Sequence, residues 1–340
     1  MKSRSAHNRE KRFWLGMLLV LILLAAGAIG ALIYVYVNDP GRLTMPLPWS
    51  NERMAYTSAD QNAMQSGEAF SSQVCIGTNN VTNSEITVGD SESAALFSID
   101  DRKVVFSREM FRPIYPASIT KIMTAILALK YGNMSDTVTV NWQDLELESG
   151  SQVVGLKIGD QVTMSELLRG LLVHSGNDCA QAIARAVGGT QDKFVDMMNE
   201  ELYAIGCTGT HFTNPTGLHD SNHYTTVYDI YLMLNEALKY DEFVNVMQIS
   251  VYDFEYTNSD GEECHVTLDS TDHYLTGEVE PPKDVTVLGG KTGTTSAAGN
   301  CLALVAQNAY GQFYISVVVG AASKDQLYED QNQLLGQINS

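Results

Sequence analysis

The most apolar part of the chain lies near its N-terminus, where residues 13–37 carry no charged side chain. At about 1.5 Å of rise per residue, a helix over this stretch exceeds the ~30 Å hydrocarbon core of a bilayer. Residues 13–37 are therefore predicted to form an uncleaved transmembrane anchor. A cleaved signal peptide is the alternative, but its apolar region usually covers only about 7–15 residues.

The charges on either side of this stretch predict its orientation. Five residues before it are basic and one is acidic, whereas Asn-Asp-Pro follows directly after it. The positive-inside rule then places residues 1–12 in the cytoplasm and everything beyond the anchor outside. Residues 38–88 are rich in Ser, Asn, Thr and Gly and lack sustained periodicity. We expect them to form a flexible stalk, least ordered over residues 51–89.

The remaining residues, 89–340, show the mixed periodicity of one α+β domain. Strand-like patterns occur at residues 94–99, 103–107, 137–140, 285–288, 301–307 and 313–319. Helical spacing of apolar residues occurs at residues 117–129, 164–173, 178–187, 191–205, 228–238 and 324–338. Strands near both ends with helices between them predict an antiparallel sheet built from both chain ends, with a mostly helical insert. The helix at 117–129 is apolar on nearly all sides, which is typical of a buried helix.

Charge and cysteine content narrow the possible functions. The net charge is -19, and an acidic protein repels phosphates, so nucleic acid is not an expected partner. The five cysteines contain no C-x-x-C pair, which argues against a zinc ribbon or a thioredoxin-like site. Because their number is odd, at least one is unpaired within the chain, and we expect buried free thiols.

The first motif with candidate chemistry is S-x-x-K, formed by Ser118 and Lys121 at the start of the buried helix. Residues three apart on a helix share one face, so the amine can reach the hydroxyl. A serine needs a base to become a good nucleophile, and a lysine can serve if burial or nearby positive charge lowers its pKa. The helix N-terminus can also stabilise an oxyanion. Alone, an N-cap serine beside an unrelated lysine explains the pattern equally well.

The second motif is S-x-N, formed by Ser175 and Asn177 in the break between two predicted helices. A loop held by helices can position a hydroxyl and an amide for catalysis. The plainer interpretation is a polar turn between helices.

The third motif is K-T-G, formed by Lys291, Thr292 and Gly293 after a predicted strand and two glycines. Glycines let the backbone approach a ligand, and the lysine offers positive charge to a carboxylate. Thr292 and the nearby Thr294 add hydroxyl groups. A strand-end turn with a solvated lysine is the plainer interpretation of this motif taken singly.

The three motifs in this order resemble the penicillin-binding protein and serine β-lactamase superfamily. Within it, the sequence looks like the low-molecular-mass serine D-Ala-D-Ala carboxypeptidases over roughly residues 94–323. Further runs carry the likeness: YPAS at 115–118, LVHSGNDC at 172–179, FTNPTGL at 212–218 and KTGTTSAAGNC at 291–301. The resemblance implies a β-lactamase/transpeptidase-like fold for residues 89–340.

The resemblance also implies roles for the motif residues. Ser118 would attack the penultimate D-Ala carbonyl and form an acyl-enzyme, with Lys121 as general base. Ser175 would pass a proton to the departing D-Ala, and Asn177 would orient the substrate and the lysine.

The K-T-G strand would hold the substrate. Lys291 would bind the terminal carboxylate and favour a neutral Lys121, while Thr292, Gly293 and Thr294 would bind the extended peptide. The backbone N–H groups of Ser118 and Thr294 would form the oxyanion hole.

The function implied is removal of the terminal D-Ala from peptidoglycan stem peptides, outside the cytoplasmic membrane of a bacterium, without metal or cofactor. β-Lactams would acylate Ser118 and so inhibit the enzyme. Removal of D-Ala and cleavage of cross-links are both compatible with these motifs. Many members carry an arginine at the position of Lys324, and many end in an amphipathic membrane helix. Here residues 13–37 are expected to be the only anchor.

Three other functions are weighed against this one. A serine β-lactamase with these motifs uses a downstream glutamate, and none lies between Glu201 and Glu236. A zinc peptidase would need a ligand motif such as H-E-x-x-H, which is absent. A non-catalytic peptidoglycan-binding scaffold remains an alternative, since fold does not fix function. The potential zinc ligands cluster in one segment, at His211, His219, Asp220 and His223.

Overall fold

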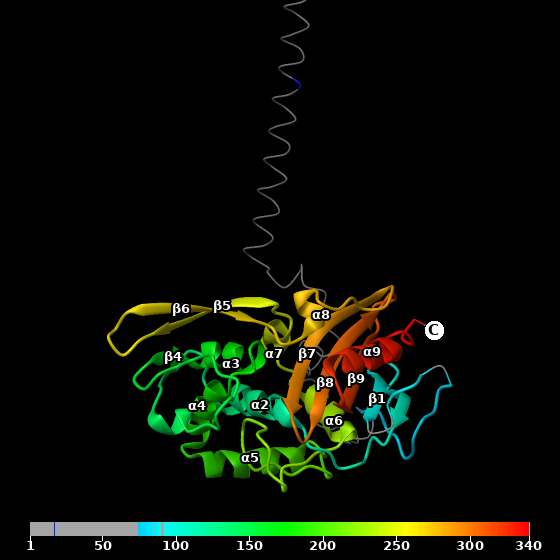
Figure 1. The fold of residues 1–340 in the computed structure, drawn as a ribbon, viewed down its shortest axis with the longest axis horizontal. Coiled ribbons are helices and arrows are strands. Elements are labelled where there is room, and N and C mark those ends of the chain that lie inside the picture. Colours follow the sequence, from blue (N-terminus) through cyan, green and yellow to red (C-terminus); the bar gives the residue numbers. More distant parts are fainter. Residues whose placement is uncertain (1–16, 18–73, 85, 90–91, 340) are drawn as a thin grey trace, which may run out of the picture. The chain divides into compact units, whose positions relative to one another are not determined.

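The computed structural model describes Met17 and residues 74–84, 86–89 and 92–339 (Figure 1). The chain falls into two compact units, Met1–Ala55 and Tyr56–Ser340, and all described residues except Met17 belong to the second. In the described ranges, no helix combines the length and apolarity needed to cross a membrane. The anchor predicted over residues 13–37 falls, apart from Met17, outside them.

The centre of the second unit is a five-stranded antiparallel sheet with the order β2-β1-β9-β8-β7. Its strands come from both ends of the domain, as the sequence predicted, because β1 pairs with β9 along its whole length. Their bounds are β1 Ser93–Ser98, β2 Lys103–Arg108, β7 Val285–Thr295, β8 Gly299–Asn308 and β9 Phe313–Ala321. Helices α6 (Val227–Ala237) and α9 (Lys324–Leu335) both contact strands β1, β8 and β9. This cover explains why β1 is buried at every position.

The insert between β2 and β7 is mostly helical and surrounds one buried helix. Helix α2 covers Lys121–Tyr131 and is buried from residue 121 to 128. It contacts helices α3 to α7 and the short turn that precedes it. This position explains the all-round apolar pattern. Residues 117–120, predicted as the start of this helix, form the separate 3-10 turn η4. The other helices of the insert are α3 Met164–Leu172, α4 Asn177–Gly188, α5 Gln191–Ala204 and α7 Asp241–Met247.

A second sheet, which the sequence analysis did not predict, has the order β3-β4-β5-β6. Figure 1 shows the β5–β6 hairpin as an arm along the side of the molecule that carries α3. Only the first of its strands matches a predicted run, and helix α8 was not predicted either. The bounds are β3 Thr137–Thr139, η5 Trp142–Leu145, β4 Gln161–Thr163, β5 Val251–Thr257, β6 Glu263–Asp269 and α8 His273–Thr276.

The described part of the predicted stalk packs against the domain. Cys75 N–H donates to Tyr231 Oη at 2.8 Å, and Thr87 N–H donates to Gln333 Oε1 at 2.8 Å. Ile86 joins the hydrophobic core under α9. The expectation of poor order is therefore wrong for residues 74–84 and 86–89, whose few apolar side chains are too widely spaced to form a periodic pattern. Residues 38–73 lie outside the described ranges.

Candidate active site

A cavity of about 340 Å³ opens where η4, the α3–α4 turn and strand β7 meet. Six of the eight residues predicted for the site line it: Ser118, Ser175, Asn177, Thr292, Gly293 and Thr294. The other two, Lys121 and Lys291, are 0% and 1% exposed and bond to the lining serines. The structure therefore brings together all eight residues from three distant segments, although the two lysines lie behind the cavity wall.

The nucleophile candidate is placed by the start of the buried helix. Ser118 lies in η4, half-buried at the cavity wall, and Lys121 is the first residue of α2. The distance from Ser118 Oγ to Lys121 Nζ is 2.8 Å. Burial, reinforced by the positive charge of Lys291, holds the pKa of Lys121 well below its usual value. The amine is therefore available as a base.

The surroundings of Lys121 Nζ assign a direction to each of its bonds. Besides Ser118 Oγ, the nitrogen lies 2.7 Å from Asn177 Oδ1 and 2.8 Å from the carbonyl oxygen of Thr216. These two oxygens can only accept, so a neutral amine donates its two N–H groups to them. Its lone pair is left facing Ser118 Oγ, whose hydroxyl can donate. This is the geometry that a general base requires.

The second serine is held by the turn between α3 and α4. Ser175 has φ +63°, a left-handed conformation that is costly outside glycine. Two backbone bonds hold the turn: Gly176 N–H donates to Gly170 O, and Asn177 N–H donates to Gln152 O. Ser175 is consequently fixed with its hydroxyl toward strand β7.

The lysine of the K-T-G motif contacts this hydroxyl. Lys291 Nζ donates to Ser175 Oγ at 2.9 Å and to the carbonyl oxygen of Thr292 at 3.0 Å. Burial lowers the pKa of Lys291 to about 7, and the negative charge of Asp272 opposes this shift. Lys291 therefore influences the cavity in two ways, through its hydrogen bond to Ser175 and through its positive charge.

Two glycines allow the backbones around the nucleophile to approach closely. A Cβ on Gly293 would lie 2.9 Å from the Ser118 nitrogen, and one on Gly217 would lie 1.9 Å from the Ala117 carbonyl oxygen. Ala117 itself has φ +48°. The residue before the nucleophile is thus held in an unfavourable conformation by neighbours that leave no room for a side chain.

Two contributors to the site were not among the residues predicted for it. The Thr216 carbonyl oxygen accepts a hydrogen bond from Lys121. This residue lies in the FTNPTGL run at 212–218, which carries the family resemblance, but it was not predicted as a site residue. Asp178 is buried and accepts the N–H groups of three consecutive residues, 154–156, which follow the cavity-lining Ser151 and Gln152. Its position directly after S-x-N was a usable signal, since a buried aspartate at the start of a helix needs donors.

The histidines considered as zinc ligands do not converge. His211 Nδ1 lies 2.7 Å from the carbonyl oxygen of Asn222, and the ring of His219 packs edge-on against Tyr115. His223 is buried among other partners. Within the part of the chain that the structure describes, these residues form no group of converging ligand atoms.

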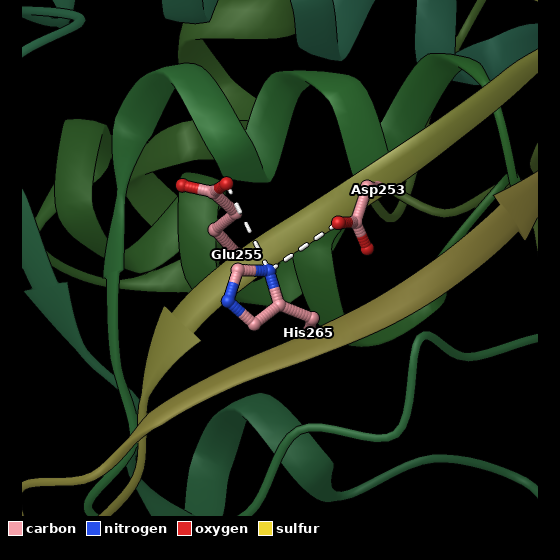
Figure 2. A group of neighbouring side chains, drawn as sticks. All are labelled: Asp253, Glu255 and His265. Carbon is pink, nitrogen blue, oxygen red and sulfur yellow. Dashed lines mark ion pairs between the residues drawn. The ribbon is translucent and has the colours of Figure 1, made fainter.

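The potential ligand atoms that do converge, among the described residues, belong to the β5–β6 hairpin. Figure 2 shows His265 between Asp253 and Glu255, with its Nδ1 at 3.4 Å and 3.8 Å from their carboxylate oxygens. All three side chains are exposed, and none lines the cavity. Exposed ion pairs of this kind contribute little stability, so we assign the group to the charged surface.

The five cysteines are free, and the prediction of buried free thiols is confirmed for four of them. Four are buried, and Cys264 is partly exposed. Burial raises the pKa of Cys301 to about 12, which makes this thiol a poor nucleophile although it borders the cavity.

Comparison with known proteins extends this picture. Residues 79–323 match the family described as D-alanyl-D-alanine carboxypeptidase. The chain is 32% identical over 237 residues to the D-alanyl-D-alanine carboxypeptidase DacF of Bacillus subtilis, covering 69% of this chain and 58% of DacF. It is 30% identical over 256 residues to DacC of Escherichia coli, covering 72% and 60%. The chain thus spans about three fifths of the length of these relatives.

Solved structures support the fold. The DD-transpeptidase of Streptomyces K15 superposes with a TM-score of 0.68 at 24% identity, covering 75% of this chain and 98% of that one. DacD of Francisella tularensis superposes with a TM-score of 0.65 at 24% identity, covering 77% and 73%. The predicted transpeptidase-like fold, with its sheet built from both ends of the domain, is therefore confirmed.

Proposed function

Because the chain belongs to the D-alanyl-D-alanine carboxypeptidase family, we propose that it is a serine D,D-carboxypeptidase. It removes the terminal D-Ala from peptidoglycan stem peptides through an acyl-enzyme on Ser118. The observation that carries this proposal is the 2.8 Å approach of Ser118 Oγ to a buried Lys121 whose pKa is lowered. A neutral amine at this distance can remove the serine proton.

Acylation begins when Lys121 takes the proton of Ser118. The serine oxygen attacks the carbonyl carbon of the penultimate D-Ala, and the carbonyl oxygen becomes an oxyanion held by the N–H groups of Ser118 and Thr294. The intermediate then collapses, and its C–N bond breaks. Ser175 relays to the departing nitrogen the proton that Lys121 took from Ser118, so Lys121 is neutral again, while Lys291 stays charged 2.9 Å from the Ser175 oxygen.

Deacylation repeats these steps with water as the nucleophile. Lys121 takes a proton from the water, whose oxygen attacks the ester carbon. The Ser118–carbonyl bond breaks, and Lys121 passes the proton it took from water to the Ser118 oxygen, 2.8 Å away. Asn177 holds Lys121 in place through both halves of the reaction, since its Oδ1 accepts from the amine at 2.7 Å.

The terminal carboxylate of the substrate would meet the K-T-G strand. Thr292 and Thr294 line the cavity, whereas the ammonium of Lys291 is buried behind it. The threonine hydroxyls are therefore the direct contacts, and Lys291 contributes its positive charge. Lys324 adds an exposed ammonium at the cavity rim, at the position where many members carry arginine.

β-Lactams would bind as mimics of the dipeptide and acylate Ser118. The same geometry serves because their strained amide presents a carbonyl carbon to the serine and a carboxylate to the K-T-G strand.

The location outside the cytoplasmic membrane, with residues 13–37 as a single-pass anchor and residues 1–12 inside, is part of the proposal. The apolar, uncharged stretch and the basic residues before it support this location. Sedimentation with membranes that is lost on deleting residues 2–37 would support it. Release of the full chain by high salt alone would contradict it.

The proposed activity is tested by measuring D-Ala release from a pentapeptide ending in D-Ala-D-Ala. Wild-type protein should release D-Ala, and S118A should release none while keeping the wild-type Tm. A folded wild type that neither releases D-Ala nor binds penicillin would favour the scaffold alternative. Rapid turnover of penicillin without D-Ala release would favour a β-lactamase.

A further inference from the structure

One buried histidine of the molecule is absent from the mechanism above. His223 is 2% exposed, and its ring stacks on Phe212 with the centroids 4.7 Å apart. Its Nδ1 lies 3.0 Å from the backbone nitrogen of Thr213, and its Nε2 lies 2.8 Å from Thr120 Oγ1. Thr120 stands directly before Lys121, so the histidine touches the segment that carries the catalytic pair.

The partners of His223 assign its proton. A backbone N–H can only donate, so Nδ1 accepts from Thr213 and the ring hydrogen resides on Nε2. Nε2–H then donates to Thr120 Oγ1, and the Thr120 hydroxyl donates to the carbonyl oxygen of Ala117 at 2.8 Å. Burial lowers the pKa of His223 to about 4, against the charge of Asp220. The ring is therefore neutral near pH 7, as these bond directions require.

This chain of bonds ends at a strained residue. Ala117 has φ +48° and immediately precedes Ser118. A conformation of this kind persists only where surrounding contacts enforce it. The bond from Thr120 to the Ala117 carbonyl is such a contact, and His223 fixes the hydroxyl that makes it.

The same polypeptide segment makes two further bonds to the catalytic helix. Thr124 Oγ1 donates to the carbonyl oxygen of Pro215, and Lys121 Nζ lies 2.8 Å from that of Thr216. Residues 213–223 thus hold one side of η4 and α2 at three points, of which His223 supplies the one that is linked through Thr120 to the Ala117 carbonyl.

We propose that His223 is a positioning residue, which acts through Thr120 on the Ala117 carbonyl and so orients Ser118 toward Lys121. It contacts no substrate atom and carries no proton in the reaction. The inference rests on the proposed function, because it concerns how fast Ser118 is acylated.

A matched pair of substitutions separates the two bonds of the ring. In H223Q the side-chain amide nitrogen takes the place of Nε2 and can still donate to Thr120. In H223N the amide oxygen takes the place of Nδ1 and can still accept from Thr213, but no donor reaches Thr120. Each variant loses one buried hydrogen bond, so their Tm values should fall by similar amounts.

The measurement is the second-order rate of acylation by fluorescent penicillin on the full chain. H223Q should stay within about threefold of wild type, whereas H223N should be slowed about tenfold or more, because small misplacements of a nucleophile are costly. T120S, which keeps the hydroxyl, should resemble wild type. T120V, which fills the same space without donor or acceptor, should resemble H223N.

Equal slowing of H223Q and H223N, or rates that follow Tm across all four variants, would overturn the positioning role. A wild-type protein that is not acylated at all would refute the proposed function, and this inference with it. The two failures are therefore told apart by the wild-type rate.

Discussion

At the scale of single residues, the chemistry depends on the protonation of two buried lysines. Lys121 must be neutral to act as a base, and Lys291 must be charged to attract a carboxylate and to keep Lys121 neutral. Burial lowers the pKa of both. Their neighbours differ: the positive charge of Lys291 lowers the pKa of Lys121 further, whereas the charge of the buried Asp272 favours the protonated form of Lys291.

Removing this charge should move the pH dependence of the reaction. In D272N the amide oxygen can still accept from Tyr274 N–H, as Asp272 Oδ1 does at 3.0 Å, but the negative charge is gone. The pKa of Lys291, about 7 in the native protein, should fall further. The alkaline limb of kcat/KM for D-Ala release should therefore shift to lower pH. An alkaline limb that stays in place, or shifts to higher pH, would contradict the claim that Asp272 keeps Lys291 protonated.

The close backbone approach at Gly217 gives a second prediction at this scale. G217A would place a methyl group 1.9 Å from the Ala117 carbonyl oxygen, at φ +82°. G277A is the control, because Gly277 has φ +77° with nothing within 4 Å of its would-be Cβ. Both variants incur the cost of about 1 kcal/mol for a left-handed alanine. Only G217A should slow penicillin acylation, by roughly a hundredfold; equal rates would contradict the proposed tight fit.

At the scale of elements, the α3–α4 turn and the loop before α3 form one unit through Asp178. Its carboxylate accepts from the backbone N–H groups of Val154, Gly155 and Leu156 at 3.1, 2.9 and 3.2 Å. This anchoring holds the loop whose Ser151 and Gln152 line the cavity.

D178N should loosen this loop, because an amide has one acceptor oxygen and turns its NH2 group toward a backbone donor. We expect the free energy of unfolding to fall by about 2–3 kcal/mol and kcat/KM for D-Ala release to fall with it. D160N is the control, because buried Asp160 accepts from Lys157 N–H in a turn outside the cavity. If D160N lowers kcat/KM as much as D178N, the effect is one of general stability. Urea unfolding and D-Ala release measure the two quantities.

The helices and strands also show which parts of the fold could be predicted from the sequence. Helices α2 to α6 and strands β8 and β9 were predicted because their apolar patterns are long, and three ordered motifs marked the active residues. Strand β7 was predicted only over residues 285–288, and helices α7 and α8 were not predicted. The β5–β6 hairpin was missed although Tyr252, Phe254 and Tyr256 alternate with acids before a turn at residues 258–261. Asp178, Thr216 and His223 act through contacts between segments far apart in the sequence, and no local pattern encodes such contacts.

At the scale of the whole molecule, residues 74–84 and 86–89 connect the start of the domain to its C-terminal part. Gly89 N–H donates to Glu92 Oε2 at 3.0 Å, and Asn83 Nδ2 donates to Gln337 Oε1 at 3.1 Å. Glu92 is 2% exposed. Burial, reinforced by the neighbouring carboxyl of Asp330, raises the pKa of Glu92 to about 8. The start of the domain is thus attached to α9 through a group that is protonated at neutral pH.

Stability should therefore depend on pH through Glu92. Its pKa in the folded protein, about 8, lies above the unfolded value of 4.5, so the folded state binds the proton more tightly. The contribution of Glu92 to the free energy of unfolding is therefore fully present below pH 4.5 and is lost as the pH rises toward 8. E92Q cannot ionise, so its Tm advantage over wild type should grow from pH 5 to pH 9. E200Q, at an exposed position, should show no such trend; a constant E92Q difference would contradict the assignment.

The central claim is that Ser118 is the nucleophile, and peptide mapping by mass spectrometry tests it most directly. The protein is incubated with benzylpenicillin, quenched, digested and sequenced by fragmentation. The account predicts one penicilloyl adduct, on the Ser118 oxygen, and its loss in both S118A and K121A. An adduct on another side chain, or full labelling of S118A, would contradict it.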